Sequence, residues 1–240
     1  MKYPIRILAV ILLIFLSTSA AQADIFMKEK EKTDAVTMMG QTTPASEKFK
    51  SIWMTADKVR MDEPEASVIM RMDKGLLYIL QHAQKSYMEV PLNFTAAAAE
   101  APAVDLGIKV TVTPTAEKKK INAWECKKYL MKLEMGGMGF ATESEVWATE
   151  EIRIDPALYA KFSTAMMAAN PMLASSVHSM LEEMKKLKGV QVQSTTSVHM
   201  MGQTIKSSTE LIEFKEGKAP EGIFELPAGY KKKSMMDDLN

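Results

Sequence analysis

The stretch that decides the fold is CKKYLMKLEM, residues 126–135. Its apolar side chains alternate with charged ones. The apolar set is Tyr129, Met131, Leu133 and Met135, and the charged set is Lys128, Lys132 and Glu134. Because successive side chains of a strand point to opposite faces, this alternation predicts a strand with one buried face and one face in water.

The same period of two recurs on both sides of this stretch. Further strands are expected at residues 24–34, 48–55, 58–61, 67–72, 76–80, 85–90, 109–113, 120–124, 142–149, 190–198 and 204–214, with a short piece near Phe224. The turn signal Asp73-Lys74-Gly75 joins residues 67–72 and 76–80 into a hairpin. Residues 95–103 are rich in alanine and contain a proline, which is typical of a loop or linker.

The period changes after residue 149. Asp155-Pro156 and Asn170-Pro171 each place a capping residue before a proline at the first helical position. Apolar residues at helical spacing then predict two helices, 156–169 and 171–188, with Gly189 just past the end of the second. A helical insert between many strands predicts an α+β fold, in which a curved antiparallel sheet, an incomplete barrel, wraps over two helices. The helix pair is the natural lid.

The first 23 residues have the form of a secretory signal peptide. Lys2 and Arg6 precede the apolar run 7–16, and Ala21-Gln22-Ala23 fits signal peptidase, so cleavage is expected after Ala23. The run is about half the roughly 20 residues that a transmembrane anchor needs. We therefore expect residues 24–240 to form a single domain without a transmembrane anchor, periplasmic or secreted.

Composition and motifs exclude several classes of function. Thirty basic and 30 acidic residues give no net charge, which argues against a nucleic-acid binder. The single cysteine, Cys126, excludes an internal disulfide framework and a cysteine-rich metal site. We expect its thiol to be buried and inert rather than reactive. A disulfide between two copies of the chain stays open. No nucleophile motif surrounds a serine, and no metal-binding spacing joins the three histidines. We expect no enzyme and no cofactor; the oligomeric state stays open.

Methionine is the unusual residue, with 21 among 240, while aromatic residues make up 7%. Methionine is flexible and polarisable, and it suits surfaces that accept varied apolar partners. The candidate cavity residues are Met54, Met61, Met70, Met72, Tyr129, Met131, Met135, Phe162, Met166 and Met184. They predict a site between sheet and helices for a lipid, an acyl chain or a hydrophobic protein segment. The alternative is that they fill the core of an interaction module that has no ligand.

A second alternative is copper. The string MMGQT occurs at residues 38–42 and 200–204, and His199 precedes the second copy. Thioether and imidazole groups suit Cu(I), so His199, Met200 and Met201 form a possible site. However, neighbouring residues of a strand point to opposite faces, so an adjacent methionine pair does not readily close on one ion. The repeat can equally mark two strand ends of similar shape.

Several stretches, taken in order, resemble a family of the bacterial envelope called domain of unknown function 4412. They are KVRMD (58–62), MRMDKGLLY (70–78), KSYME (85–89), EKKKINAWECKKY (117–129), EVW (145–147) and FELPAGY (224–230). Asn122-Ala123 stands where the family pattern has a glycine before the aromatic residue. The family is similar in fold to the periplasmic lipoprotein carriers LolA and LolB. The resemblance implies an incomplete antiparallel barrel over helices around an apolar cavity, and it brings no catalytic residues.

Two arginines in these stretches lie near carboxylates. Arg60 is two residues before Asp62, and Arg71 is two residues before Asp73. Both arginines are expected to pair with Asp62 or Asp73 at the strand ends. The expected role of both pairs is structural.

Overall fold

The computed structural model describes residues 23–38, 41–92, 108–136, 140–155, 177–200 and 203–233. The elements are β1 (Ile25–Thr33), β2 (Val36–Met38), β3 (Gln41–Thr43), β4 (Ser46–Met54), β5 (Lys58–Asp62), β6 (Ala66–Arg71), β7 (Leu76–Gln81), β8 (Ser86–Pro91), β9 (Ile108–Ile121), β10 (Trp124–Met135), β11 (Phe140–Thr149), α3 (Val177–Met184), β12 (Val190–Met200), β13 (Gln203–Glu216) and β14 (Lys231–Lys232). Strands therefore dominate the described part of the chain, as the period of two predicts.

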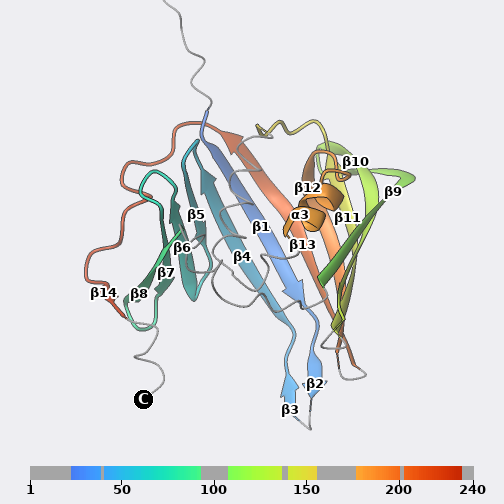
Figure 1. The fold of residues 1–240 in the computed structure, drawn as a ribbon, viewed down its shortest axis with the longest axis horizontal. Helices are drawn as coiled ribbons and strands as arrows, with labels where there is room; N and C mark the ends of the chain where they lie inside the picture. Colours follow the sequence, from blue (N-terminus) through green and yellow to red (C-terminus); the bar gives the residue numbers. More distant parts are fainter. Residues whose placement is uncertain are drawn as a thin grey trace, which may run out of the picture.

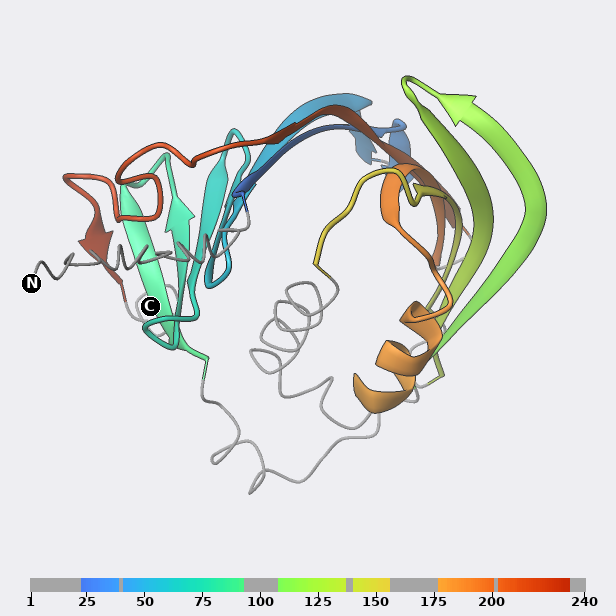
Figure 2. The ribbon, with the colours of Figure 1, turned by 90° about the horizontal axis from the view of Figure 1, so that it is seen from above.

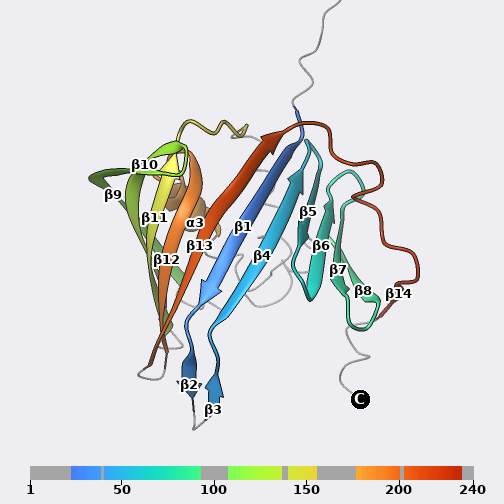
Figure 3. The same cartoon turned by 180° about the vertical axis from the view of Figure 1, so that it is seen from behind.

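Twelve of the strands form one sheet in the order β14-β8-β7-β6-β5-β4-β1-β13-β12-β11-β10-β9. Neighbours pair antiparallel, except that β14 pairs parallel with β8. The first strand, β1, joins the two halves, because it pairs with β4 on one side and with β13 on the other. The sheet is strongly curved, and α3 lies on its concave side (Figures 1 and 2). We call this side the inner face and the opposite side, seen in Figure 3, the outer face.

Two of the expected strands are wrong. Residues 120–124 do not form a separate strand, because β9 runs to Ile121, β10 begins at Trp124, and Asn122-Ala123 is the turn between them. Asn122 has φ +53°, a left-handed conformation that asparagine tolerates, and its Nδ2 donates to the carbonyl of Leu211 at 3.3 Å. The piece near Phe224 is a turn, closed by a hydrogen bond from Glu225 N to Gly222 O.

The two predicted helices are not confirmed as a pair. The described residues contain one short helix, α3, which lies inside the span predicted for the second helix, 171–188. The predicted helix 156–169 falls outside the described residues. The helix α3 ends at Met184, where the turns Lys186 N to Glu183 O and Leu187 N to Met184 O tighten the backbone. Gly189 therefore does not cap the helix directly.

Gly189 is needed for a different reason. Its φ is +87°, and a Cβ at this position would lie inside contact distance of the carbonyl group of Thr149 and 2.9 Å from Glu150 N. Only a residue without a side chain allows β12 to start this close to the end of β11.

Apolar side chains gather in three clusters. The first lies against strands β1 and β4–β8 and continues across the sheet through Leu211, Val192, Trp147, Cys126 and Ile121 on β13, β12, β11, β10 and β9. The second lies between α3 and strands β9–β11. The third lies on the outer face, where residues 217–233 cross β5–β8 and Phe224 packs against Ile69, Tyr78 and Leu80 (Figure 3).

Candidate functional site

The inner face carries one apolar patch on strands β1 and β4–β8, which we call the first patch. Strand pairing aligns its side chains in two rows. The rows are Ile25, Met54, Val59, Met70, Leu77 and Val90, and Met27, Ile52, Met61, Val68, Ile79 and Met88. Partners in an antiparallel ladder share a face, so the two rows form a continuous surface. Met54 and Met70 are fully buried in it, whereas Met61, Met72 and Ile79 are partly buried.

A second patch lies at the other end of the inner face. It consists of Val110, Val112, Tyr129, Val146 and Ala148, with Met131 and Leu133 beside them and Met180, Met184 and Leu187 from the helix segment above them. Two polar contacts hold this segment in place. The carboxylate of Glu183 accepts the backbone N–H of Val112 at 2.8 Å, and the hydroxyl of Tyr129 accepts the N–H of Lys188 at 3.3 Å.

A polar band covers part of the inner face between the two patches. It is incomplete, because Leu211, which pairs with Glu29, and Val192 are buried there and belong to the first apolar cluster. Along one line of partners Val146 is followed by Ser194, Thr209, Glu31 and Lys48, and along the next Met131 is followed by Ser144, Thr196, Ser207 and Thr33. These residues share the inner face with the patches, because the pairing is continuous. The hydroxyls of Ser144 and Thr196 are 2.9 Å apart.

An ion pair lies at the edge of the band, next to the first patch. Lys50 Nζ lies 2.8 Å from the Glu29 carboxylate, and the two side chains are only 27% and 16% exposed. On the same two strands, Glu29 and Lys50 are one pleat beyond Met27 and Ile52. The apolar surface of the first patch therefore meets a pair of opposite charges on β1 and β4, and beside Glu29 it continues through buried Leu211 on β13.

The structure divides the predicted cavity residues between the patches. Met54, Met61, Met70 and Met72 come together in or against the first, and Tyr129, Met131 and Met184 in the second. Met135 is partly buried on β10 and belongs to neither cluster. Phe162 and Met166 lie outside the described residues. That these side chains contact a ligand stays a prediction.

Sequence reasoning missed three methionines that share this surface, Met27, Met88 and Met180. A partial signal for Met27 was present, because Met27 lies two residues after apolar Ile25 within the expected strand 24–34. The polar band was also missed.

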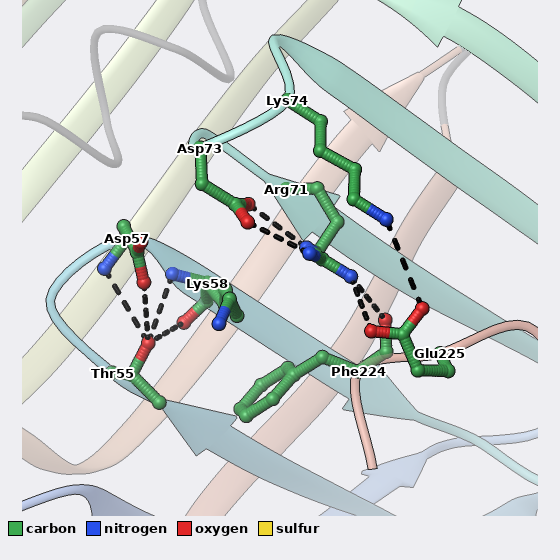
Figure 4. Close-up of polar contacts among 8 residues, drawn as sticks. All are labelled: Thr55, Asp57, Lys58, Arg71, Asp73, Lys74, Phe224 and Glu225. Carbon is green, nitrogen blue, oxygen red and sulfur yellow. Dashed lines mark hydrogen bonds and ion pairs between the residues drawn. The ribbon is translucent and has the colours of Figure 1, made fainter. Parts of the chain in front are cut away.

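On the outer face, two arginines hold the C-terminal segment, and both predicted pairs with aspartate are confirmed. Buried Arg71 donates to both oxygens of Asp73 at 2.8 and 2.7 Å, to Glu225 Oε1 at 2.7 Å and to the carbonyl of Phe224 at 3.4 Å (Figure 4). Arg60 pairs with Asp62 at 2.8 Å and donates to the carbonyl of Ile223 at 2.7 Å. The FELPAGY stretch therefore acts as a strap across β5 and β6.

A second series of polar contacts holds the strap at its far end. Ser67 donates to Asp62 Oδ1 at 2.5 Å and lies 2.9 Å from His82 Nε2, and His82 Nδ1 lies 2.7 Å from the Tyr230 hydroxyl. Since the Ser67 hydrogen is directed to Asp62, His82 Nε2 donates to Ser67, and Nδ1 of the same ring contacts the Tyr230 hydroxyl. Ser67 is fully buried, and its proton goes to a carboxylate rather than to the histidine. This series of hydrogen bonds connects elements of the fold. It does not have the arrangement of a catalytic nucleophile and its base.

The Arg71–Asp73 pair predicts an acid-sensitive contribution to stability. Hydrogen bonding by Arg71 lowers the pKa of Asp73. A lowered pKa in the folded state stabilises the protein above the unfolded value of about 4, and this contribution is lost as pH falls through the folded value. We expect the free energy of unfolding, measured by urea titration, to decrease below about pH 4. Asp73→Asn should be less stable at pH 7 and should show a smaller decrease in acid; an unchanged decrease would contradict this origin.

The remaining candidates show no reactive arrangement. Cys126 is buried, as expected, and burial raises the pKa of its thiol, which disfavours the thiolate. In the two copies of MMGQT, the described backbone pairs at strand ends, Met38 with Gln41 and Met200 with Gln203. His199 Nδ1 lies 3.0 Å from Thr204 Oγ1, while Met201 and the Met200 side chain fall outside the described part. Among the described residues, no three His, Cys, Asp or Glu side chains converge as metal ligands.

Within the ranges that the structure describes, no helix has the length and apolar character to cross a bilayer.

Several known proteins show a distant similarity in sequence or in structure. An uncharacterized protein of Aquifex aeolicus is 22% identical over 203 residues, covering 76% of this chain and 74% of its own. Among solved structures, PNGF-II has a TM-score of 0.42 at 12% identity; the match covers 90% of this chain, which spans about a third (32%) of the length of PNGF-II.

Two smaller solved proteins match over most of their length. One is a putative outer membrane lipoprotein-sorting protein domain from Vibrio parahaemolyticus, with TM-score 0.33, 7% identity and coverage of 85% of this chain and 89% of that one. The other is a DUF1329 family protein from Desulfovibrio piger, with TM-score 0.34, 6% identity and coverage of 85% and 90%. TM-scores this low do not establish a common topology.

The family comparison is more definite. The model of the family described as "Domain of unknown function (DUF4412)" matches residues 27–230, from the first strand to the end of the strap. The match covers all six stretches that carry the resemblance in the sequence. This chain belongs to the DUF4412 family.

Proposed function

We propose that this protein is a non-enzymatic binding protein of the bacterial periplasm that holds acyl chains on the inner face of its sheet. The observation that carries the proposal is that two methionine-rich apolar patches lie on one face of one curved sheet. Fully buried Met54, Met70 and Tyr129 form the floor, and partly buried Met61, Met72 and Met131 stand at its margin. Flexible thioether side chains adapt to acyl chains of different length.

The polar clusters on the outer face support a binding role over an enzymatic one. Each is used to hold the strap, and the serine in them is buried. The periplasmic location rests on the form of residues 1–23, which is that of a signal peptide.

The test is native mass spectrometry of the protein purified from the periplasm, followed by organic extraction. A bound species of acyl-chain mass, released on denaturation, is the expected result. A mass equal to the polypeptide alone, unchanged after incubation with oleic acid, would contradict the proposal and favour the interaction module with a filled core.

A charge introduced within the first patch should weaken binding. Met61→Glu is expected to weaken binding of a fluorescent fatty acid at least 10-fold, because a carboxylate must then be desolvated beside the acyl chain. Phe49→Glu is the matched control, since Phe49 lies on the adjacent strand β4 and is 45% exposed. Fluorescence titration measures both, with thermal midpoints to show that the variants are folded. Equal affinity of Met61→Glu and the unmodified protein would place the ligand elsewhere.

A further inference from the structure

The twelve-stranded sheet ends at β9, and the described part of the chain places no further strand beside it. An edge strand presents N–H and C=O groups to which another chain can add as a further strand. One hydrogen bond shows which groups of β9 point to this edge. Val112 faces Met131 in the pairing with β10, but its N–H donates to the carboxylate of Glu183 at 2.8 Å. Because the hydrogen-bonding direction alternates along a strand, Ile108 and Val110 also direct their backbone groups to the edge.

The second half of β9 is unsuited to strand addition. Pro114 continues the same alternation but has no N–H to donate. Beyond it, residues 117–120 are exposed and carry charged side chains, three of them lysines. Lysine and proline on an edge strand disfavour pairing with another chain. The segment of the edge that can accept a strand is therefore residues 108–112.

The helix α3 places one carboxylate on this segment. Met180 and Met184 pack in the same cluster as Val110 and Val112, which sets α3 beside β9 (Figure 2). One carboxylate oxygen of Glu183 lies 2.6 Å from Lys186 Nζ, and the other accepts the N–H of Val112. The Glu183 carboxylate thus occupies the position where the carbonyl oxygen of an added strand would accept.

We propose that Glu183 blocks the addition of a second copy of this chain, whose own β9 fits residues 108–112 as an antiparallel strand. The proposal does not depend on the proposed function. Two identical strands pair about a two-fold axis, so the register is defined by the residue that lies on the axis.

Two of the three registers near the centre of the segment are unfavourable. With Lys109 on the axis, the lysines of the two copies lie directly opposite each other, and like charges in this position are destabilising. With Thr111 on the axis, Ile108 faces Pro114 of the second copy, which offers no N–H.

The register with Val110 on the axis has neither fault. Ile108 then faces Val112 of the second copy, and Lys109 faces Thr111. Each N–H of Ile108, Val110 and Val112 meets a carbonyl oxygen of the other copy. This register needs the same Val112 N–H that Glu183 holds, so the intramolecular hydrogen bond and the dimer exclude each other.

The first test removes the carboxylate. Glu183→Ala frees the Val112 N–H, whereas Glu182→Ala is the matched control, because Glu182 precedes it on α3, is exposed and pairs with Lys185. Sedimentation velocity over a concentration series measures self-association, and thermal midpoints show that the variants are folded. Glu183→Ala is expected to dimerise roughly 10-fold or more tightly than the unmodified protein or Glu182→Ala. Equal self-association of the three proteins would overturn the proposal.

The second test examines the register. Thr111 is exposed, so a substitution there changes the edge without entering the core. In the Glu183→Ala background, Thr111→Lys places a lysine opposite Lys109 of the second copy and should restore the monomer. Thr111→Glu places a carboxylate there instead and should tighten the dimer. A dimer that responds in the same way to both substitutions would show that the copies do not pair through β9.

Hydrogen exchange of the unmodified protein provides a test that needs no substitution, so it applies even where Glu183→Ala does not fold. The Val112 amide is expected to exchange roughly 10-fold or more slowly than the Val110 amide, because Glu183 accepts the first and the described residues supply no acceptor for the second. Equal exchange of the two amides would show that Glu183 does not hold the edge.

Discussion

Gly189→Ala is expected to destabilise the protein by roughly 3 kcal/mol or more. Two effects add at this position. The left-handed φ of +87° alone costs a residue with a Cβ about 1–2 kcal/mol. The new methyl group would also overlap the carbonyl of Thr149, which is backbone and cannot turn away. The junction between α3 and β12 would have to move relative to β11. Urea unfolding measures the resulting decrease in the free energy of unfolding.

Gly75→Ala separates the two effects. Gly75 also has a left-handed φ, +65°, but a Cβ there meets nothing within 4 Å. This variant should lose only about 1 kcal/mol, from the backbone conformation. If Gly189→Ala were no more destabilising than Gly75→Ala, the close approach to Thr149 would not limit the choice of residue.

Arg71→Ala is expected to cost roughly 2–3 kcal/mol and to loosen the strap. Arg71 is buried and makes four hydrogen bonds, two of which hold the strap at Phe224 and Glu225. Its removal leaves Asp73 without its cation and the carbonyl of Phe224 without that donor. This expected loss of stability is smaller than the usual cost of breaking a buried ion pair, because Glu225 is largely exposed and water can solvate it.

Two measurements check this prediction. Urea unfolding gives the loss of stability, and limited proteolysis should show earlier cleavage within residues 217–233. Lys132→Ala is the control, because Lys132 pairs with Glu134 at the same spacing of two residues but both side chains are exposed. It should leave the unfolding midpoint and the cleavage pattern almost unchanged. Equal cleavage of Arg71→Ala and the unmodified protein would show that the strap is held by Phe224 packing instead.

Much of the fold could be predicted because strand signals are local. The alternation of Tyr129, Met131 and Leu133 with charged residues depends only on the pleat, and β10 follows it. The boundaries at Asn122-Ala123 and Phe224 could not be predicted with the same rule. At both places the backbone turns because distant partners hold it, β13 in the first case and the outer face of β6 and β7 in the second.

The sequence by itself determined the strand-rich fold and the arginine–aspartate pairs, because both depend on neighbours a few positions apart. It also determined the membership in the family, through six short stretches in a fixed order. Only the tertiary structure decided that the methionines form two patches rather than one. The division arises because β1 joins β4 to β13, which aligns Glu31 and Lys48 with Thr209 and Ser194 across the middle of the inner face. Pairing between strands separated by more than 150 residues leaves no periodic trace in the chain, so no local pattern could indicate where the band would lie.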